Sequence, residues 1–307
     1  QNNLNHNFVK IKKNNNKNLN ILENIIKKKS NFVPTTTWLI FDSLCKKIKR
    51  SNHKVILSGA GGDEMYGGYY MHHLHFLYSI RNENYFNIKL NEWKKYVLPL
   101  IRNNNLKDFK NFKNLKSDSD RKFLEYLHNR TYIKKRSSKM KMPNLKNKLD
   151  YFKKNLFLDF FHYSLPGQLA PMDNIAMYNG LENRSPLLSG EIYKYLLSVP
   201  TKFYIQKGYN KTILRDMLKD ILPKKIIKDR NKIGFFMDID SIFDFKSPKI
   251  KNLIFKNKFI KKIINLNKID EIIKKNNKNN QESHFLLSLI NISLFLKNYE
   301  GKNTSVL

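Results

Sequence analysis

The sequence predicts an α/β fold in which the end of a parallel sheet is followed by a large, mostly helical region. Residues 54–57 (KVIL) form a short apolar run, rich in β-branched side chains, that is typical of a buried parallel strand. The glycine-rich segment 58–68 (SGAGGDEMYGG) follows at once, as in a tight strand-to-helix connection. Further along the chain, apolar residues recur mainly at helical spacing.

Three elements are expected before this strand. Residues 8–11 alternate in polarity and predict a strand, and residues 18–29 show helical spacing. After Pro34, threonines can cap a second helix. Its apolar face consists of Phe41, Leu44, Cys45 and Ile48. Strand, helices and strand form a βαβ-like unit, which implies a parallel sheet. We expect Cys45 to pack in the core rather than to act in catalysis.

Helices are also expected after the glycine-rich segment. Residues 71–159 are typical of amphipathic helices with lysine-rich outer faces, and Lys134–Arg136 of a solvated loop. Ser189 can cap a helix whose predicted inward residues are Ile192, Tyr195, Leu196 and Val199. The next helix, ended by Pro223, carries a stripe of Leu214, Met217, Leu218 and Ile221. Residues 285–296 are apolar on all sides and predict a buried helix.

Composition narrows the class of protein. With 307 residues and 41% apolar content, the chain can form one or two domains with real cores. Its single cysteine excludes an internal disulfide framework and a cysteine-based zinc cluster, and fits a reducing compartment. No secretory leader is visible, and the longest apolar run is too short to cross a bilayer. We therefore expect a cytoplasmic protein with no membrane partner.

The formal charge of +33 raises the alternative of a non-catalytic basic helical protein that binds nucleic acid or a partner. However, 49 of the 58 basic residues are lysines, and they are spread along the chain among asparagine runs. Nucleic-acid binders tend to cluster their charge and to favour arginine. We do not expect nucleic acid to be the partner. The cluster His72, His73 and His75 lacks the spacing of a metal site and is interpreted as surface or packing residues.

The glycine-rich segment is where chemistry is expected. Glycine backbones allow a phosphate to approach bare N–H groups. A carboxylate in such a loop repels phosphate unless a cation lies between them, so Asp63 is interpreted as a magnesium ligand. The alternative is a tight turn with a solvated acidic pair, Asp63 and Glu64.

Two later segments also carry unusual residues. Glu182 and Arg184 lie on one side of the chain if residues 182–184 form a strand, and are either a structural ion pair or a carboxylate ready for proton transfer. Three of only nine arginines, Arg184, Arg215 and Arg230, lie in these segments, which suggests positions that need a fork-shaped donor. Lys232 follows in a predicted loop.

Three blocks together resemble one family. The segments LSGAGGDEMYGGY, LPGQLAPMDNIAMYNGLENRSPLL, and the pair NKTILR and DRNKIGF are similar in order and spacing to the C-terminal synthetase domain of glutamine-dependent asparagine synthetases and related amidotransferases. The resemblance covers nearly the whole chain. It implies that residues 1–70 are the end of an adenine-nucleotide alpha-hydrolase-like (PP-loop) parallel sheet with its second nucleotide loop, and that residues 71–307 are mostly helical.

The resemblance also implies a reaction. A carboxylate substrate is adenylated by ATP and Mg²⁺, and glutamine-derived ammonia then attacks the acyl-adenylate. Lys232 and Glu182 match catalytic residues, and Asp63 matches the magnesium ligand. The implied ATP and pyrophosphate contacts are Ser58, Gly59, Gly61, Gly62 and Lys211. Implied structural support comes from Asp173, Arg184, Arg215 and Arg230. The implied partners are a small-molecule carboxylate and a glutaminase domain of the same parent chain, with a homodimer as a further possibility.

The sequence departs from the family pattern at three points. The first phosphate loop (Ser-Gly-Gly-x-Asp-Ser) and the glutaminase domain are absent, so we expect a fragment that is inactive by itself. Ala60 stands where asparagine synthetases carry a glutamate tied to the aspartate substrate, which raises the alternative of another carboxylate on a sugar or peptide precursor. Ser189 replaces an aspartate, a change between two helix-capping residues.

Overall fold

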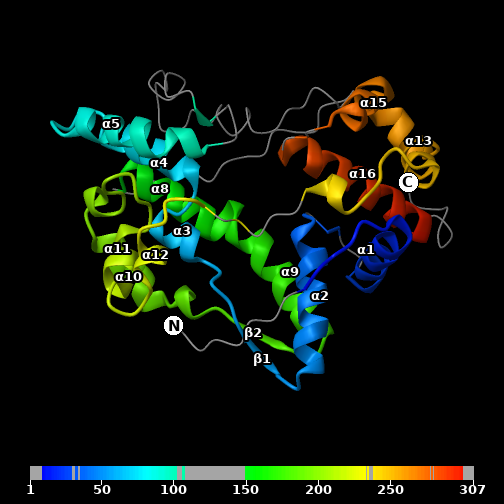
Figure 1. Cartoon of the computed structure of the whole chain (residues 1–307), viewed down its shortest axis with the longest axis horizontal. Coiled ribbons are helices and arrows are strands. Elements are labelled where there is room, and N and C mark those ends of the chain that lie inside the picture. Colours follow the sequence, from blue (N-terminus) through cyan, green and yellow to red (C-terminus); the bar gives the residue numbers. More distant parts are fainter. Residues whose placement is uncertain are drawn as a thin grey trace.

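The computed structural model describes residues 9–29, 32–33, 35–101, 106–107, 149–232, 234, 238–276, 278 and 280–299. This part of the chain is mostly helical, with one small parallel sheet (Figure 1). The strands are β1 (Val55–Leu57) and β2 (Glu182–Arg184). The α-helices are α1 (Asn15–Lys29), α2 (Thr37–Arg50), α3 (Gly62–Tyr66), α4 (Tyr70–Ser79), α5 (Phe86–Tyr96), α8 (Tyr151–Leu158), α9 (Leu165–Tyr178), α10 (Gly190–Ser198), α11 (Thr212–Leu218), α12 (Lys224–Ile227), α13 (Pro248–Phe255), α14 (Lys258–Ile263), α15 (Leu266–Lys274) and α16 (Asn280–Tyr299). Shorter turns of helix are the 3₁₀ segments Leu98–Leu100, Pro186–Leu188, Thr201–Phe203 and Ile239–Ser241, and the π-helix Asp159–Tyr163.

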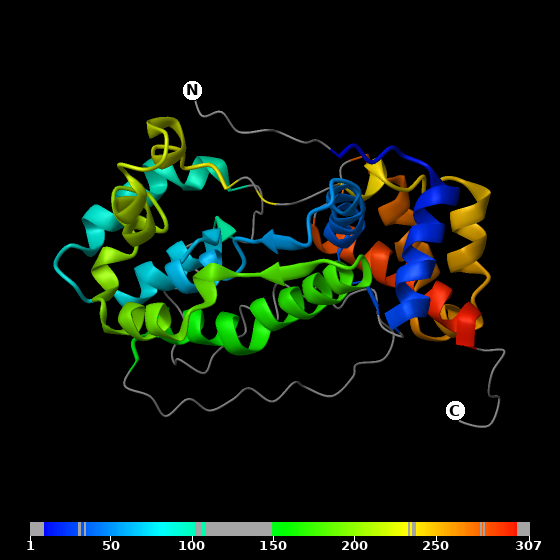
Figure 2. The same cartoon turned by 90° about the horizontal axis from the view of Figure 1, so that it is seen from below.

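The sheet is parallel, as predicted, but its first strand is not buried. β1 and β2 pair in parallel, with Val55 opposite Glu182 and Leu57 opposite Arg184 (Figure 2). Val55 is 42% exposed and Leu57 is 72% exposed, so the expectation of a buried strand is wrong. The physical reason is the lack of neighbours: α9 packs along β2, but the described residues provide neither a third strand nor a cover for the open face.

The predicted first strand is also wrong. Residues 9–14 are irregular, while Phe8 lies outside the described residues. The Asn18 side-chain amide donates to the carbonyl of Lys12 (3.1 Å), so this carbonyl is bound by a side chain instead of a neighbouring strand. The βαβ-like unit therefore does not form as expected. The described parts of the connection between the two parallel strands are mostly helical and run from α3 to α9.

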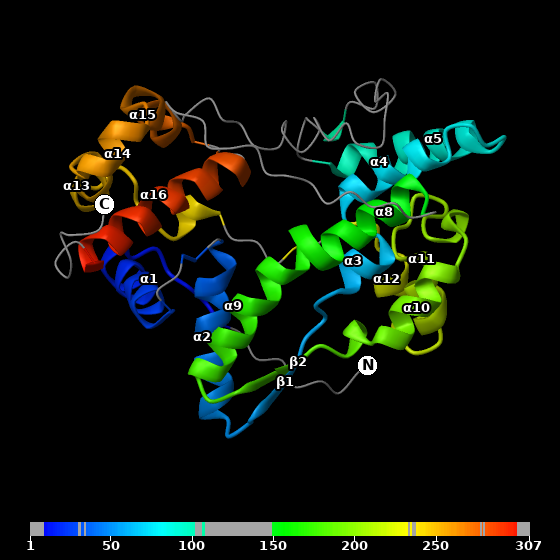
Figure 3. The same ribbon diagram turned by 180° about the vertical axis from the view of Figure 1, so that it is seen from behind.

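Two hydrophobic cores organise the helices, and Figures 1 and 3 show them as two groups of helices joined by α9 and the sheet. The first core contains buried residues of α1, α2 and α13–α16, and the second contains buried residues of α3–α5, α8 and α10. The predicted buried last helix is confirmed, since Leu286 and Ile290 of α16 are fully buried. The helix predicted over residues 18–29 is confirmed as α1.

The exposure of single side chains and the helix caps agree with some of the local predictions and not with others. Cys45 is fully buried, and burial, with the nearby Asp42 charge, raises the pKa of its thiol to about 12, which confirms a packing role. Ser189 caps α10 by accepting a hydrogen bond from Glu191 N. Thr36 precedes α2, but its side chain makes no capping hydrogen bond. The predicted inward placement of Tyr195 is wrong, since this side chain is 61% exposed. In the stripe predicted for the next helix, Met217 and Ile221 are 62% and 74% exposed.

Two further predictions concern residues between α3 and α8. The described parts of residues 71–159 are mostly helical, whereas Lys134–Arg136 lie outside the described residues. His72, His73 and His75 are buried on α4, as packing residues. None of the described helices has the length and apolar character needed to cross a membrane.

Candidate functional site

The candidate site begins where β1 and β2 end. The Ser58 amide donates to the carbonyl of Arg184 (2.8 Å), and the hydroxyls of Ser58 and Ser185 lie 2.8 Å apart. Both strands are parallel, so their carboxyl ends meet at the same edge, where α/β proteins bind ligands. The predicted nucleotide loop leaves this edge and turns into α3.

Glycines let the loop approach the segment after β2. Gly61 has φ +86°, and a Cβ there would lie 2.1 Å from Leu188 Cδ2. A Cβ at Gly62 would lie 3.1 Å from Leu187 Cδ1. By contrast, a Cβ at Gly59 would meet nothing within 4 Å, so this glycine leaves open space beside the backbone.

Asp63 lies at the centre of the site, between two lysines. Lys211 Nζ is 2.7 Å from Asp63 Oδ1, and Lys232 Nζ is 3.2 Å from Asp63 Oδ2. All three side chains are mostly shielded, with 22–30% exposed. The structure therefore brings together three of the residues predicted from the sequence, although they come from distant parts of the chain.

Lys211 reaches Asp63 from an unusual backbone conformation. It precedes α11 with φ +53° and ψ +35°, a left-handed conformation that costs a non-glycine residue on the order of 1 kcal/mol. The adjacent Asn210 side chain is buried and donates to the carbonyl of Gly68 (2.7 Å). Arg215 donates from Nε to the Asn210 carbonyl (2.8 Å) and from a terminal nitrogen to Ile227 O (2.6 Å). Arg215 therefore ties the residue before Lys211 to the end of α12, and its predicted supporting role stays a prediction.

Lys232 is held by its backbone as well as by its ammonium. Its amide donates to the hydroxyl of Tyr70 (3.2 Å). Two residues earlier, the Arg230 guanidinium lies over the rings of Tyr209 and Tyr96, at 3.8 Å and 4.4 Å from their centroids, and donates to Lys207 O. Arg230 therefore ties the segment before Lys232 to Lys207 and to two tyrosine rings, and its predicted support role stays a prediction.

Burial and neighbouring charges shift the pKa values of Asp63 and Lys232 in opposite directions. Burial favours the neutral form of Asp63, but the charges of Lys232 and Lys211 outweigh it and lower the pKa of this carboxyl. Burial is also the largest influence on Lys232 and lowers the pKa of its ammonium, although Asp63 opposes the shift. Two ammonium groups flank Asp63, and the negative charge of the nearby Glu64 also favours the charged form of Lys232.

A second set of residues supports the site and was not predicted from the sequence. Glu64 is 2% exposed. Its Oε1 atom accepts hydrogen bonds from the Tyr69 hydroxyl, from Ser164 Oγ (2.7 Å) and from Gln168 Nε2 (2.9 Å). Lys232 Nζ lies 3.5 Å from the centroid of the Tyr69 ring. The spacing of Ser164 and Gln168 on one helical face was the only sequence signal for this network.

The remaining predicted site residues lie elsewhere. Glu182 accepts a hydrogen bond from Arg184 Nε (2.8 Å), and both side chains are more than half exposed. The segment is a strand, so the two side chains share one side as expected, and Glu182 lies at the end of β2 away from Ser185. Asp173 is exposed on α9. Their catalytic and supporting roles stay predictions.

Asp63 fits a magnesium ion only in combination with another ligand. The described residues contain no group of three or more His, Cys, Asp or Glu side chains that could hold a metal ion. Magnesium is commonly bound through one or two carboxylates together with phosphate oxygens and water. A phosphate ligand that attracts the two lysines would free the Asp63 oxygens for this ion, so the residues fit magnesium as a partner of a phosphate group.

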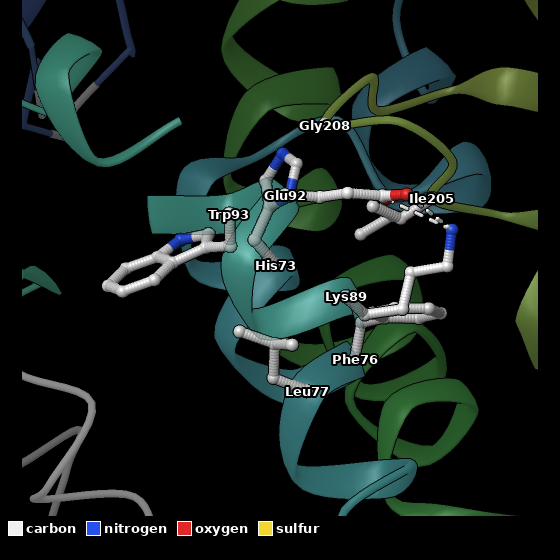
Figure 4. A pocket seen from close by; sticks show the side chains of 8 residues that line it. All are labelled: His73, Phe76, Leu77, Lys89, Glu92, Trp93, Ile205 and Gly208. Carbon is white, nitrogen blue, oxygen red and sulfur yellow. Dashed lines mark hydrogen bonds and ion pairs between the residues drawn. The ribbon is translucent and has the colours of Figure 1, made fainter. Parts of the chain in front are cut away.

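A small cavity lies beside α4 and α5, apart from these residues (Figure 4). His73, Trp93 and Ile205 are among its lining residues. Lys89 Nζ binds Glu92 (3.0 Å) and the Gln206 side-chain carbonyl (2.7 Å) at its rim. Its lining is mainly apolar and its polar rim groups bind one another, so we assign it to packing.

The sequence was also compared with models of known protein families. The family model for asparagine synthase matches residues 14–297. This match spans most of the chain, and the protein belongs to the asparagine synthase family. The search of curated proteins gave no match. Membership places the chain in a family of ATP-dependent ligases of the amidotransferase type.

Proposed function

We propose that this chain is the synthetase part of a glutamine-dependent amidotransferase, which adenylates a carboxylate with ATP and then forms an amide with ammonia. The observation that carries the proposal is the arrangement of Lys211 and Lys232 on the two oxygens of Asp63. Two cations on either side of one shielded carboxylate suit a ligand that brings several negative charges and a metal ion.

In the proposed reaction, a carboxylate oxygen of the substrate attacks the α-phosphorus of ATP, and the bond to pyrophosphate breaks. Lys211 and Lys232 stabilise the charge that develops on the phosphates and on leaving pyrophosphate. Asp63 would hold Mg²⁺, which supplies further positive charge when bound with the phosphates. Ammonia then attacks the acyl carbon, AMP leaves, and the nitrogen loses a proton. The family resemblance assigns this proton transfer to Glu182, which would first have to leave its ion pair with Arg184.

The remaining parts of the proposal concern the parent protein. We propose that a further segment of the same parent chain supplies the first phosphate loop and the glutaminase domain. The exposed face of β1 is compatible with further strands of a PP-loop sheet, because Val55 and Leu57 need apolar neighbours for burial. The substrate is a small-molecule carboxylate, and the Ala60 position favours one other than aspartate.

Calorimetric titration of the 307-residue chain tests the site. We expect pyrophosphate with Mg²⁺ to bind, Mg²⁺ alone to bind at least tenfold more weakly because of the two lysines, and Lys211→Ala to weaken pyrophosphate binding about tenfold. Lys194→Ala, at an exposed position on α10, is the matched control. The chain by itself should not release pyrophosphate from ATP. Binding of duplex nucleic acid but not of pyrophosphate would favour the basic-protein alternative and overturn this proposal.

A further inference from the structure

We propose that Tyr69 is a positioning residue for Lys232, whose ring holds the lysine ammonium beside Asp63. The inference rests on the proposed function, since it assumes that Lys232 acts on a phosphate ligand. It goes further by assigning a role to Tyr69 and to the buried network around Glu64.

The ammonium of Lys232 contacts both an aromatic ring and a carboxylate. Its Nζ atom lies 3.5 Å from the Tyr69 ring centroid and 3.2 Å from Asp63 Oδ2. A cation over an aromatic face is attracted by the negative potential of the ring, and the attraction is stronger when water is excluded. The Lys232 side chain is only 22% exposed, so this condition holds. A phosphate or metal ion that engages Asp63 would leave the contact with the ring in place.

The ring can position a lysine only if the ring itself is fixed. The Tyr69 hydroxyl donates to Glu64 Oε1, and it also lies within hydrogen-bond distance of Ser164 Oγ and Gln168 Nε2, both at 3.1 Å. Glu64 is almost fully buried, so its carboxylate has little freedom to move. Burial, followed by the negative charge of Glu64, raises the pKa of Tyr69, which keeps its hydroxyl protonated as a donor.

The helix that supplies two members of this network has an irregular turn at the right place. The π-helix Asp159–Tyr163 ends at Ser164, whose amide donates to the carbonyl of Asp159 (3.0 Å). Such insertions change which residues face a neighbouring element, and they are frequent at functional sites. Here Ser164 and Gln168 both face Glu64 and also bind each other (2.7 Å). The fold thus places three polar side chains, Glu64, Ser164 and Gln168, behind the Tyr69 ring.

The position of Lys232 can be read by NMR of the chain labelled with [ε-¹³C]lysine. The ring current of Tyr69 should shift the Lys232 ε-methylene protons upfield, and loss of this signal in Lys232→Arg assigns it. Tyr69→Leu should remove the shift and weaken binding of Mg²⁺ with pyrophosphate about tenfold. Tyr69→Phe keeps an aromatic face, so it should keep the upfield signal and bind within about threefold of the original chain. Tyr195→Leu, at an exposed tyrosine, is the matched control.

The outcomes separate this inference from the proposed function. An upfield lysine signal that disappears in Tyr69→Leu and persists in Tyr69→Phe shows the contact between the ring and Lys232, and the positioning role is supported when Tyr69→Leu also loses affinity for pyrophosphate. If the original chain does not bind pyrophosphate, the proposed function fails and the NMR signal still decides the geometry. The inference is overturned if Tyr69→Leu, folded by its thermal melt, keeps the Lys232 signal, or if it keeps the original pyrophosphate affinity.

Discussion

Gly68 leaves no room for a side chain beside Asp63: a Cβ at this position would lie 1.9 Å from Asp63 Oδ1 and 2.3 Å from Lys211 Cε. The Gly68 amide also donates to the Asp63 carbonyl (2.8 Å), which fixes the two residues relative to each other. The absence of a side chain at Gly68 is therefore a condition for the contact between Asp63 and Lys211.

Gly68→Ala should consequently disrupt the site more than the fold. The added methyl group must displace Asp63 or Lys211, and we expect affinity for Mg²⁺ with pyrophosphate to fall at least tenfold, measured by calorimetry. Gly190→Ala is the control, because a Cβ there would meet nothing within 4 Å. Equal affinities of the two variants would show that the Gly68 contact does not matter for binding.

The buried His73 gives a prediction about pH. Burial, followed by the charge of His72, lowers the pKa of His73 to about 3, whereas an exposed histidine titrates near 6.5. The unfolded chain therefore binds a proton below about pH 6.5 that the folded chain does not, and stability decreases as the pH falls toward 3. Between pH 7 and pH 5, His73 alone should cost about 2 kcal/mol of unfolding free energy.

The measurement is urea unfolding at several pH values for the original chain and for His73→Gln. The variant cannot take up this proton, so its stability should depend less on pH over this range. His53→Gln, at an exposed position, should keep the original pH dependence. An unchanged slope in His73→Gln would contradict a neutral, buried histidine.

The sequence predicted which residues come together at the site better than it predicted the residues that support them. Asp63, Lys211 and Lys232 could be found because glycine spacing and the family resemblance mark them individually. The network around Glu64 could not, because its partner Gln168 is 104 positions away and no periodicity links a carboxylate to a distant amide. The prediction of burial failed for the same reason. Leu57 has a side chain that is typical of a core strand, but its exposure depends on which neighbouring elements cover it.

Ala60 predicts substrate preference in the full-length protein. It lies in the loop between Gly59 and Gly61, where asparagine synthetases carry a glutamate tied to aspartate. Losing one charge-assisted contact costs on the order of 1.5–3 kcal/mol, so aspartate should be a poor substrate relative to sugar or peptide carboxylates. Steady-state assays of pyrophosphate release with a panel of carboxylates measure this preference. Efficient asparagine formation, with aspartate as the best substrate, would refute it.

Substitution of Lys232 distinguishes the enzyme hypothesis from the alternative of a non-catalytic basic protein. If it is one of 49 interchangeable lysines, Lys232→Ala should matter no more than a change at the exposed Lys94. If it stabilises charge on the phosphates, its loss should slow the chemical step by about 10²–10³ and leave the fold intact. The assay follows pyrophosphate release by the full-length protein, with a thermal melt of each variant.

Lys232→Arg adds a test of geometry to the test of charge. The planar guanidinium is larger than an ammonium and cannot occupy the same position between the Tyr69 ring and Asp63 Oδ2. We therefore expect only partial rescue, with a rate between those of Lys232→Ala and the original protein. Near-normal turnover by Lys232→Ala, or its unfolding under assay conditions, would remove the catalytic assignment. Full rescue by arginine would mean that the role of this residue does not require a compact ammonium, since a guanidinium can also lie over an aromatic ring.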